Sequence, residues 1–362
     1  MCLNTQRNHS LGVSCKLKNK PTKKSKMQAL FKTKPILSFI VLTFGISFTF
    51  WFLPVIVSLP KDIGFAMILI GLCGPLIAGY LITIINSVEK IKIDSKPIFF
   101  TVFIVTALVL FLRLYFVNNG WHDINGNVPD LNEVSILGYI CFGIVLFILA
   151  INFSNATNLK LKENYIKSSL FEKGKVKWYI IGVFLLILLC LGSYFMGDVL
   201  GMETTDFVVK PEPILLVGFF SSFFFLGGNE EFGWRGFLQK ELQKKYNPLI
   251  GTLAISFLWS LWHLPLHYNG FYSTGGFVDL LPRFAWTIPL TIIFTWLYNK
   301  SSYSVLAVML LHATVNNISR AFGYSEIILT VLAFLFTVFC IINDKMWQKK
   351  NYNHIYENNI TD

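Results

Sequence analysis

Long apolar stretches separated by short polar ones dominate this chain. A helix that crosses a bilayer needs about 20 mainly apolar residues, and ten stretches approach that length. They lie at residues 35–58, 64–86, 97–118, 134–153, 177–197, 213–229, 249–267, 280–299, 304–319 and 325–343. The sixth and the last two are short or contain polar residues. The pattern therefore predicts an all-α, polytopic membrane helical bundle with about 8–10 transmembrane helices.

The connecting segments alternate in charge. Lys residues are concentrated before the first stretch and after the second, fourth, sixth and tenth stretches. The other connections are poorer in Lys and carry Asp123, Asp130, Glu133, Asp198, Glu203 and Asp206. Because basic loops tend to stay on the cytoplasmic side of a membrane, we predict that both termini are cytoplasmic.

The polar segments also suggest four parts. We expect a basic polar arm at 1–34, a first group of transmembrane helices at 35–176, a second group at 177–345 and a polar tail at 346–362. The first 26 residues lack the apolar core of a signal peptide. They form either a disordered arm or an over-extended start before Met27.

Composition agrees with a membrane protein and argues against other classes. Hydrophobic residues make up 54% of the chain and charged residues only 14%, against about 25% charged in soluble domains. The net charge is +11, but no basic helix or stacking platform is visible, so we expect no nucleic-acid partner. The six cysteines form no CxxC pair, which gives no support for a disulfide framework or a zinc knuckle.

Ionisable residues inside apolar stretches are rare and usually mark function. Arg113 is the main one in the first half of the chain. Polar candidates gather instead in the second half, and they are Glu230, Glu231, Arg235, His263, His267, His312 and Asn316.

Helical spacing gives the two adjacent glutamates different roles. At about 100° per residue, Glu231 and Arg235 lie four residues apart on one face and can form an ion pair. Glu230 points away from that pair, and a carboxylate placed in this way suits a general base. The alternative for Glu230 is a hydrogen bond between helices.

The histidines come from two different helices. His312 and Asn316 are four residues apart and can face one cavity. His263 and His267 have the same spacing, which could suit a metal ion, but Pro265 disrupts the helix between them. We therefore favour His263 as a site residue and interpret His267 as interfacial.

Position along the helices supports a single site. Counting about 1.5 Å per residue from the inner edges of their helices places Glu230, His263 and His312 at a similar depth. We interpret Trp259 and Trp262, like Trp286, as packing or membrane-belt residues.

Three motifs then occur in order along apolar helices. They are EExxxR from Glu230 to Arg235, aromatic-x-x-x-His from Trp259 to His263, and HxxxN from His312 to Asn316. The chain thereby resembles the CPBP family, which includes type II CAAX prenyl endopeptidases, lysostaphin-resistance-protein-A-like proteins and bacteriocin-immunity proteins of the Abi group. The resemblance covers roughly residues 180–345. Trp259 stands where the family's second motif usually has Phe.

The resemblance implies an intramembrane endopeptidase. Glu230 resembles the general base that activates water, and His263 resembles the group that helps to hold it. His312 and Asn316 resemble the pair that stabilises the oxyanion of the tetrahedral intermediate.

The resemblance leaves the cofactor open. Family members are often named metalloproteases, and Glu230, His263 and His312 could hold zinc with an open position. A metal-free glutamate mechanism explains the same residues, so we expect either no cofactor or zinc. Glu231 and Arg235 would support the site.

The expected partners are the lipid bilayer and a peptide or membrane-protein substrate, and the relatives imply a bacterial cell membrane. The alternative is a non-catalytic bacteriocin-immunity or interaction protein on the same helices, which would tolerate Glu230→Gln. A transporter ranks third, because no inverted repeat is found.

Overall fold

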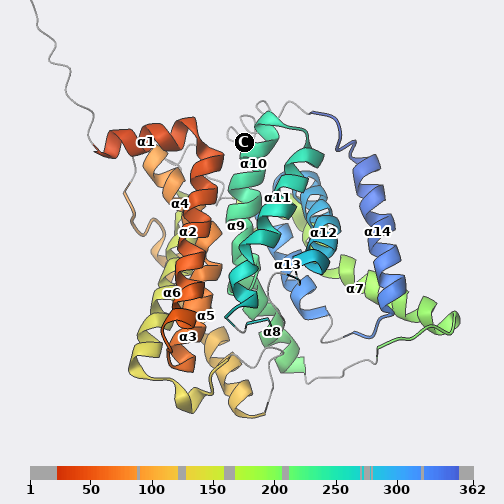
Figure 1. Ribbon diagram of the computed structural model, residues 1–362, viewed down its shortest axis with the longest axis horizontal. Coiled ribbons are helices and arrows are strands. Elements are labelled where there is room, and N and C mark those ends of the chain that lie inside the picture. Colours follow the sequence, from red (N-terminus) through yellow and green to blue (C-terminus); the bar gives the residue numbers. More distant parts are fainter. Residues whose placement is uncertain are drawn as a thin grey trace, which may run out of the picture.

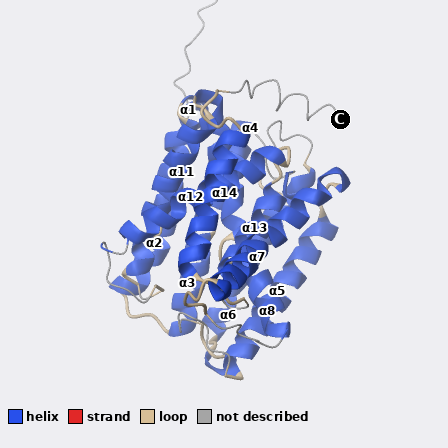
Figure 2. Cartoon of the chain, turned by 90° about the vertical axis from the view of Figure 1, so that its right-hand side faces the viewer, coloured by secondary structure: helices blue, strands red, loops and turns tan. Residues whose placement is uncertain are grey.

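The protein is a bundle of helices, seen here in a computed structural model. The structure describes residues 23–87, 90–120, 128–158, 168–205, 212–269, 271–272, 278, 280–318 and 322–349. All regular structure in these residues is helical (Figures 1 and 2). The predicted all-α membrane bundle is thus confirmed. Most of the predicted polar arm and tail, at residues 1–22 and 350–362, lies outside the described residues.

The helices fall into a first and a second group along the chain. The first group is α1 (Lys23–Thr33), α2 (Pro35–Ile56), α3 (Lys61–Leu72), α4 (Gly74–Ser87), α5 (Lys96–Asn118) and α6 (Ile136–Ser154). The second is α7 (Val176–Val199), α8 (Glu212–Phe224), α9 (Glu231–Gly233), α10 (Lys240–Lys245), α11 (Pro248–Trp262), α12 (Leu280–Lys300), α13 (Val305–Ile318) and α14 (Glu326–Asn343).

Capping residues fix where several of these helices begin. The side chains of Ser95, Ser135 and Asn247 each accept a hydrogen bond from the backbone N–H three residues further on, at the starts of α5, α6 and α11. The Asp62 carboxylate in α3 also accepts hydrogen bonds from the backbone N–H and the hydroxyl of Ser135, at 2.9 and 2.6 Å. This contact ties α3 to the start of α6.

Each of the ten predicted stretches contains a helix. In the described residues, seven helical segments are long and apolar enough to cross a membrane, or eight when α3 and α4, bent by 48°, count as one broken span. The count of seven or eight therefore meets the predicted range of about 8–10 transmembrane helices only at its lower end. α12 is outside this set, and α13 is apolar but shorter. The cytoplasmic orientation of the termini stays a prediction.

The second group packs directly on the first. In Figure 1, α1 to α6 lie on the left, α8 to α11 in the middle, and α7 and α14 on the right. Aromatic pairs join the left and middle parts: Trp51 lies 4.6 Å from Trp262, and Phe153 lies 5.2 Å from Phe232, between ring centroids. Both groups therefore contribute to one hydrophobic core.

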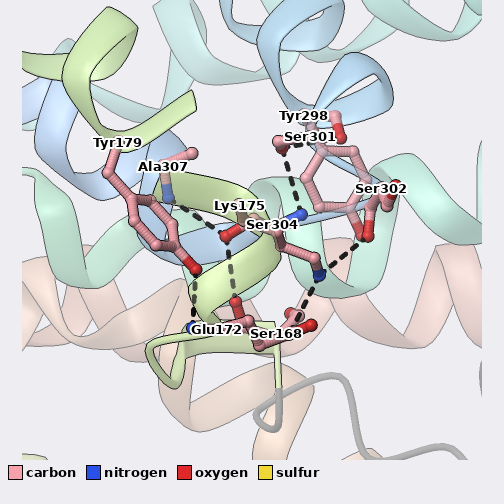
Figure 3. A network of polar contacts seen from close by, with 9 residues as sticks. All are labelled: Ser168, Glu172, Lys175, Tyr179, Tyr298, Ser301, Ser302, Ser304 and Ala307. Atoms are coloured by element: carbon pink, nitrogen blue, oxygen red, sulfur yellow. Dashed lines mark hydrogen bonds and ion pairs between the residues drawn. The ribbon is translucent and has the colours of Figure 1, made fainter. Parts of the chain in front are cut away.

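A polar network fixes the start of α13, which carries His312 further along (Figure 3). The Ser304 hydroxyl caps α13 by accepting the backbone N–H of Ala307 at 3.3 Å. Lys175, at the start of α7, donates to the Ser302 carbonyl at 3.2 Å and pairs with Glu172 at 2.8 Å. The α12–α13 turn is thus held by the segment that precedes α7.

Candidate active site

The backbone is irregular where the adjacent glutamates lie. α8 ends at Phe224, Gly227 has φ of +151°, and residues Gly228–Glu230 form a 3₁₀ turn. A π-helical segment then runs over Trp234–Gln239. Such π segments are rare and often occur at functional sites. The chain does continue to Lys245 as one 33-residue candidate span, but the break at the two glycines makes it discontinuous.

Glu231 is the centre of a buried charge cluster. Arg235 Nη1 donates to both oxygens of the Glu231 carboxylate, at 3.0 and 2.8 Å, and both side chains are fully buried. The predicted ion pair is therefore present. Glu231 Oε1 also lies 2.6 Å from Nδ1 of His312, a bond that the spacing of the motifs did not predict. One carboxylate thus orients a histidine from another helix.

Aromatic rings cover the guanidinium of Arg235. Its central carbon lies 5.3 Å from the ring centre of Trp259 and 4.7 Å from that of Phe294. Cation–π contacts of this kind stabilise a charge that is removed from water.

Glu230 has a different environment from its neighbour. Its Oε2 accepts a hydrogen bond from Nε1 of Trp259 at 2.9 Å, and only 2% of the residue is exposed. It forms no ion pair within the described segments. Oε1 is therefore the oxygen available for chemistry. Trp259, which we expected to be a packing or belt residue, does pack in the core, and its indole N–H also holds the candidate base.

Trp259 also organises the two histidines. Its ring centre lies 5.7 Å from that of His263 and 5.4 Å from that of His312. Its carbonyl oxygen lies 2.7 Å from Nδ1 of His263. A carbonyl can only accept, so Nδ1 carries the proton, and the neutral ring presents a lone pair at Nε2.

His312 and Asn316 face the backbone at Gly227. A Cβ atom at Gly227 would lie 2.5 Å from Nε2 of His312 and 2.7 Å from Nδ2 of Asn316. Asn316 Nδ2 also donates to the Leu226 carbonyl at 2.6 Å, which uses one of its two N–H groups. The four predicted catalytic residues are therefore gathered around Gly227 and Trp259.

His267 lies in the turn that follows α11. As predicted, α11 ends before Pro265, and Leu264–His267 form a 3₁₀ turn. His267 is buried with its ring 4.9 Å from Tyr272. Arg113 is buried in α5, in the first group of helices.

Asn229 connects the site to the first group, and sequence reasoning missed it. Its Nδ2 donates to the Leu72 carbonyl and to Cys73 Sγ, both at 3.4 Å, at the bend between α3 and α4. Its position between the two glycines and the two glutamates is the signal that could have singled it out.

The candidate zinc ligands do not form a preformed metal site. Nowhere in the described residues does a group of three or more His, Cys, Asp or Glu side chains lie together so that it could hold a metal ion. Glu230, His263 and His312 share the site, but they do not fit zinc in this arrangement.

Part of the second group of helices is similar to a known protein family. Residues 212–318 match the family model described as type II CAAX prenyl endopeptidase, Rce1-like. This segment is therefore similar to a type II CAAX prenyl endopeptidase domain. It contains all three motifs, from Glu230 to Asn316. The predicted resemblance is thereby confirmed.

A curated relative extends the similarity beyond residues 212–318. The CAAX prenyl protease 2 of Methanococcus maripaludis is 24% identical over 280 residues, which cover 71% of this chain and 97% of the relative. An alignment of that length cannot fit within residues 177–345. The similarity therefore includes part of the first group of helices, beyond the region 180–345 that the motifs suggested.

Proposed function

We propose that this protein is an intramembrane endopeptidase that hydrolyses a peptide bond with a water molecule activated by Glu230. The observation that carries the proposal is the environment of Glu230: a buried carboxylate with one oxygen held by Trp259, no ion pair in the described segments, and two oriented imidazoles nearby. The name of the archaeal relative favours a prenylated C-terminal peptide as the substrate. The two alternative substrate classes are a leader peptide and another membrane protein.

The first step is the attack of water on the scissile carbonyl. Glu230 Oε1 removes a proton from the water as its oxygen bonds to the carbonyl carbon. The lone pair at Nε2 of His263 accepts the water's other proton in a hydrogen bond and so orients the water for attack.

The next step needs donors for the developing negative charge. The second N–H of Asn316 can donate to the oxyanion. Nε2 of His312 faces the same backbone at Gly227, and the Glu231 carboxylate holds that ring through Nδ1, so we place the ring beside the same oxyanion. The C–N bond then breaks, and the proton held by Glu230 moves to the leaving nitrogen. One water is consumed, and a carboxylic acid and an amine are formed.

This mechanism contains no metal step, because the residues present do not fit a metal site. We therefore expect that cleavage persists after treatment with a zinc chelator. Loss of cleavage with the chelator, and its return with added zinc, would instead assign Glu230, His263 and His312 to a metal.

The direct test is a cleavage assay in liposomes with farnesylated and leader-type peptides. General-base catalysis is worth about 10²–10⁴-fold, so Glu230→Gln should lower the rate by that factor. The matched control is Glu241→Gln, which removes a carboxylate paired with Lys244 at 2.7 Å, away from the site. Cleavage by Glu230→Gln at the wild-type rate would refute the proposal. A folded wild type that cuts no peptide would favour the non-catalytic interaction protein.

A further inference from the structure

A second set of buried polar side chains lies where three helical elements meet. These are the π segment together with α10, then α11, and then α12. We call this set the polar seam. It consists of Gln239, Gln243, Thr252, Thr291, Thr295 and Asn299. The first five are fully buried, and the amide atoms of Asn299 are buried as well.

The seam residues face one another across three helical elements. Thr291, Thr295 and Asn299 of α12 are four residues apart, and so are Gln239 and Gln243. This spacing keeps side chains on one face of a helix. Thr252 Oγ1 donates to Thr295 Oγ1 at 2.9 Å, and Thr295 Oγ1 donates to Gln239 Oε1 at 3.2 Å. These two bonds place the polar faces of the three elements against each other.

The seam has one end at the active site and the other at a charged edge. Thr252 lies one turn into α11, which begins just after α10 ends, and its partner Thr295 lies near the end of α12. The ends of α10 and α12, at Lys245 and Lys300, are therefore on the same side. In the other direction, the π segment leads from Gln239 to Arg235, whose Nη1 holds Glu231.

Many polar atoms of the seam lack a partner. Gln239 Nε2, Thr291 Oγ1 and both amide atoms of Gln243 and of Asn299 have no hydrogen bond within the part of the chain that is described. At the end of the seam next to the active site, Nε and Nη2 of Arg235 also have no hydrogen-bond partner in the described residues. A buried polar atom without a partner is costly, and the usual solution in proteins is ordered water, which makes about three hydrogen bonds.

We propose that the polar seam binds a file of water molecules that runs from the lysine-bearing ends of α10 and α12 to Arg235 beside the active site. The unpaired donors and acceptors on the facing sides of the π segment, α10 and α12 are groups of the kind that bound waters need, with two to four partners for each water. This inference rests on the proposed hydrolysis, which consumes water at a site inside the membrane. The seam supplies that water by a path that does not cross the bilayer. Aromatic rings cover Arg235 on its other faces.

The first test detects the water itself and does not depend on catalysis. A structure of the full chain in a lipid nanodisc, at a resolution that shows ordered water, should place waters on Gln239 Nε2, on Thr291 Oγ1 and on the Gln243 amide. The same waters should be present in Glu230→Gln. Direct bonds among these side chains, with no water between them, would overturn the proposal.

The second test measures the effect on turnover. Thr295→Val keeps the side-chain shape and removes the hydroxyl that joins Thr252 to Gln239. The loss of one or two hydrogen bonds should lower kcat about five- to tenfold with KM unchanged. The matched control is Thr337→Val in α14, a buried threonine whose hydroxyl, among the described residues, bonds only to the Ala333 carbonyl of its own helix. Equal kcat for the two variants would refute a role for the seam.

The two measurements separate this inference from the proposed function. If the wild type has ordered water in the seam but cuts no peptide, the water file is supported and the proposed endopeptidase activity is refuted. If cleavage depends on Glu230 but no water is bound in the seam, the proposed endopeptidase activity is supported and the water file is refuted.

Discussion

Replacing Trp259 by phenylalanine tests whether its indole N–H holds the catalytic base. The substitution keeps an aromatic ring between His263 and His312 and removes the donor that lies 2.9 Å from Glu230 Oε2. Hydrogen bonds to charged groups contribute about 1.5–3 kcal/mol. At about 1.4 kcal/mol for each factor of ten, we expect kcat to fall about 10- to 100-fold.

Trp262→Phe is the matched control for this prediction. Trp262 is also fully buried, but its Nε1 has no hydrogen-bond partner among the described residues. Both variants lose the same side-chain volume and one N–H, so packing defects should affect them alike. We expect Trp262→Phe to keep kcat within about threefold, a difference of less than 1 kcal/mol.

The assay is peptide cleavage in liposomes, with KM and kcat measured separately and with the melting temperature of each variant recorded. An equal loss of kcat in the two tryptophan variants at equal melting temperatures would contradict a catalytic role of the Trp259 N–H. An increase in KM alone for Trp259→Phe would contradict it as well, because a group that holds the base should act on the chemical step.

Three further predictions concern the site and its support. Gly227→Ala should abolish cleavage, because its Cβ would lie 2.5 Å from Nε2 of His312 at a φ of +151°; Gly45→Ala, with nothing within 4 Å of its Cβ, should keep cleavage. Glu231→Gln should destabilise the protein by about 3–5 kcal/mol, because it leaves the buried Arg235 charge uncompensated; thermal unfolding checks this, and an unchanged melting temperature would contradict it. Asp62→Ala removes two hydrogen bonds at the start of α6 and should cost about 1–3 kcal/mol, with the rate of cleavage preserved below the unfolding transition.

Sequence periodicity predicted most of the fold because burial in a bilayer requires long apolar helices. The ten stretches, the ion pair of Glu231 with Arg235 and the end of α11 before Pro265 all follow from local spacing. The break at Gly227 is different. A glycine pair such as Gly227 and Gly228 permits a kink or close packing by a local rule, but local spacing does not predict that His312 of α13 fills the space that a side chain at Gly227 would need.

The contacts between helices were the part of the site that sequence could not provide. The bond from Glu231 to His312 spans 81 positions, and that from Asn229 to Leu72 spans 157. Helical spacing relates residues within one element only. The motif from Trp259 to His263 did contain the missing information, since their backbone contact needs that four-residue separation, but a tryptophan in an apolar helix is more commonly a packing residue.

The shared core has a consequence for any attempt to produce the second group of helices alone. A Cβ at Gly233 would collide with the backbone of Pro75, so α9 and α4 are in direct backbone contact. A truncated protein that starts at residue 177 would expose this face, together with Trp234 and Trp262, to lipid. Co-expression of residues 1–176 as a separate polypeptide should restore the missing surface, much as split transmembrane proteins reassemble from two pieces.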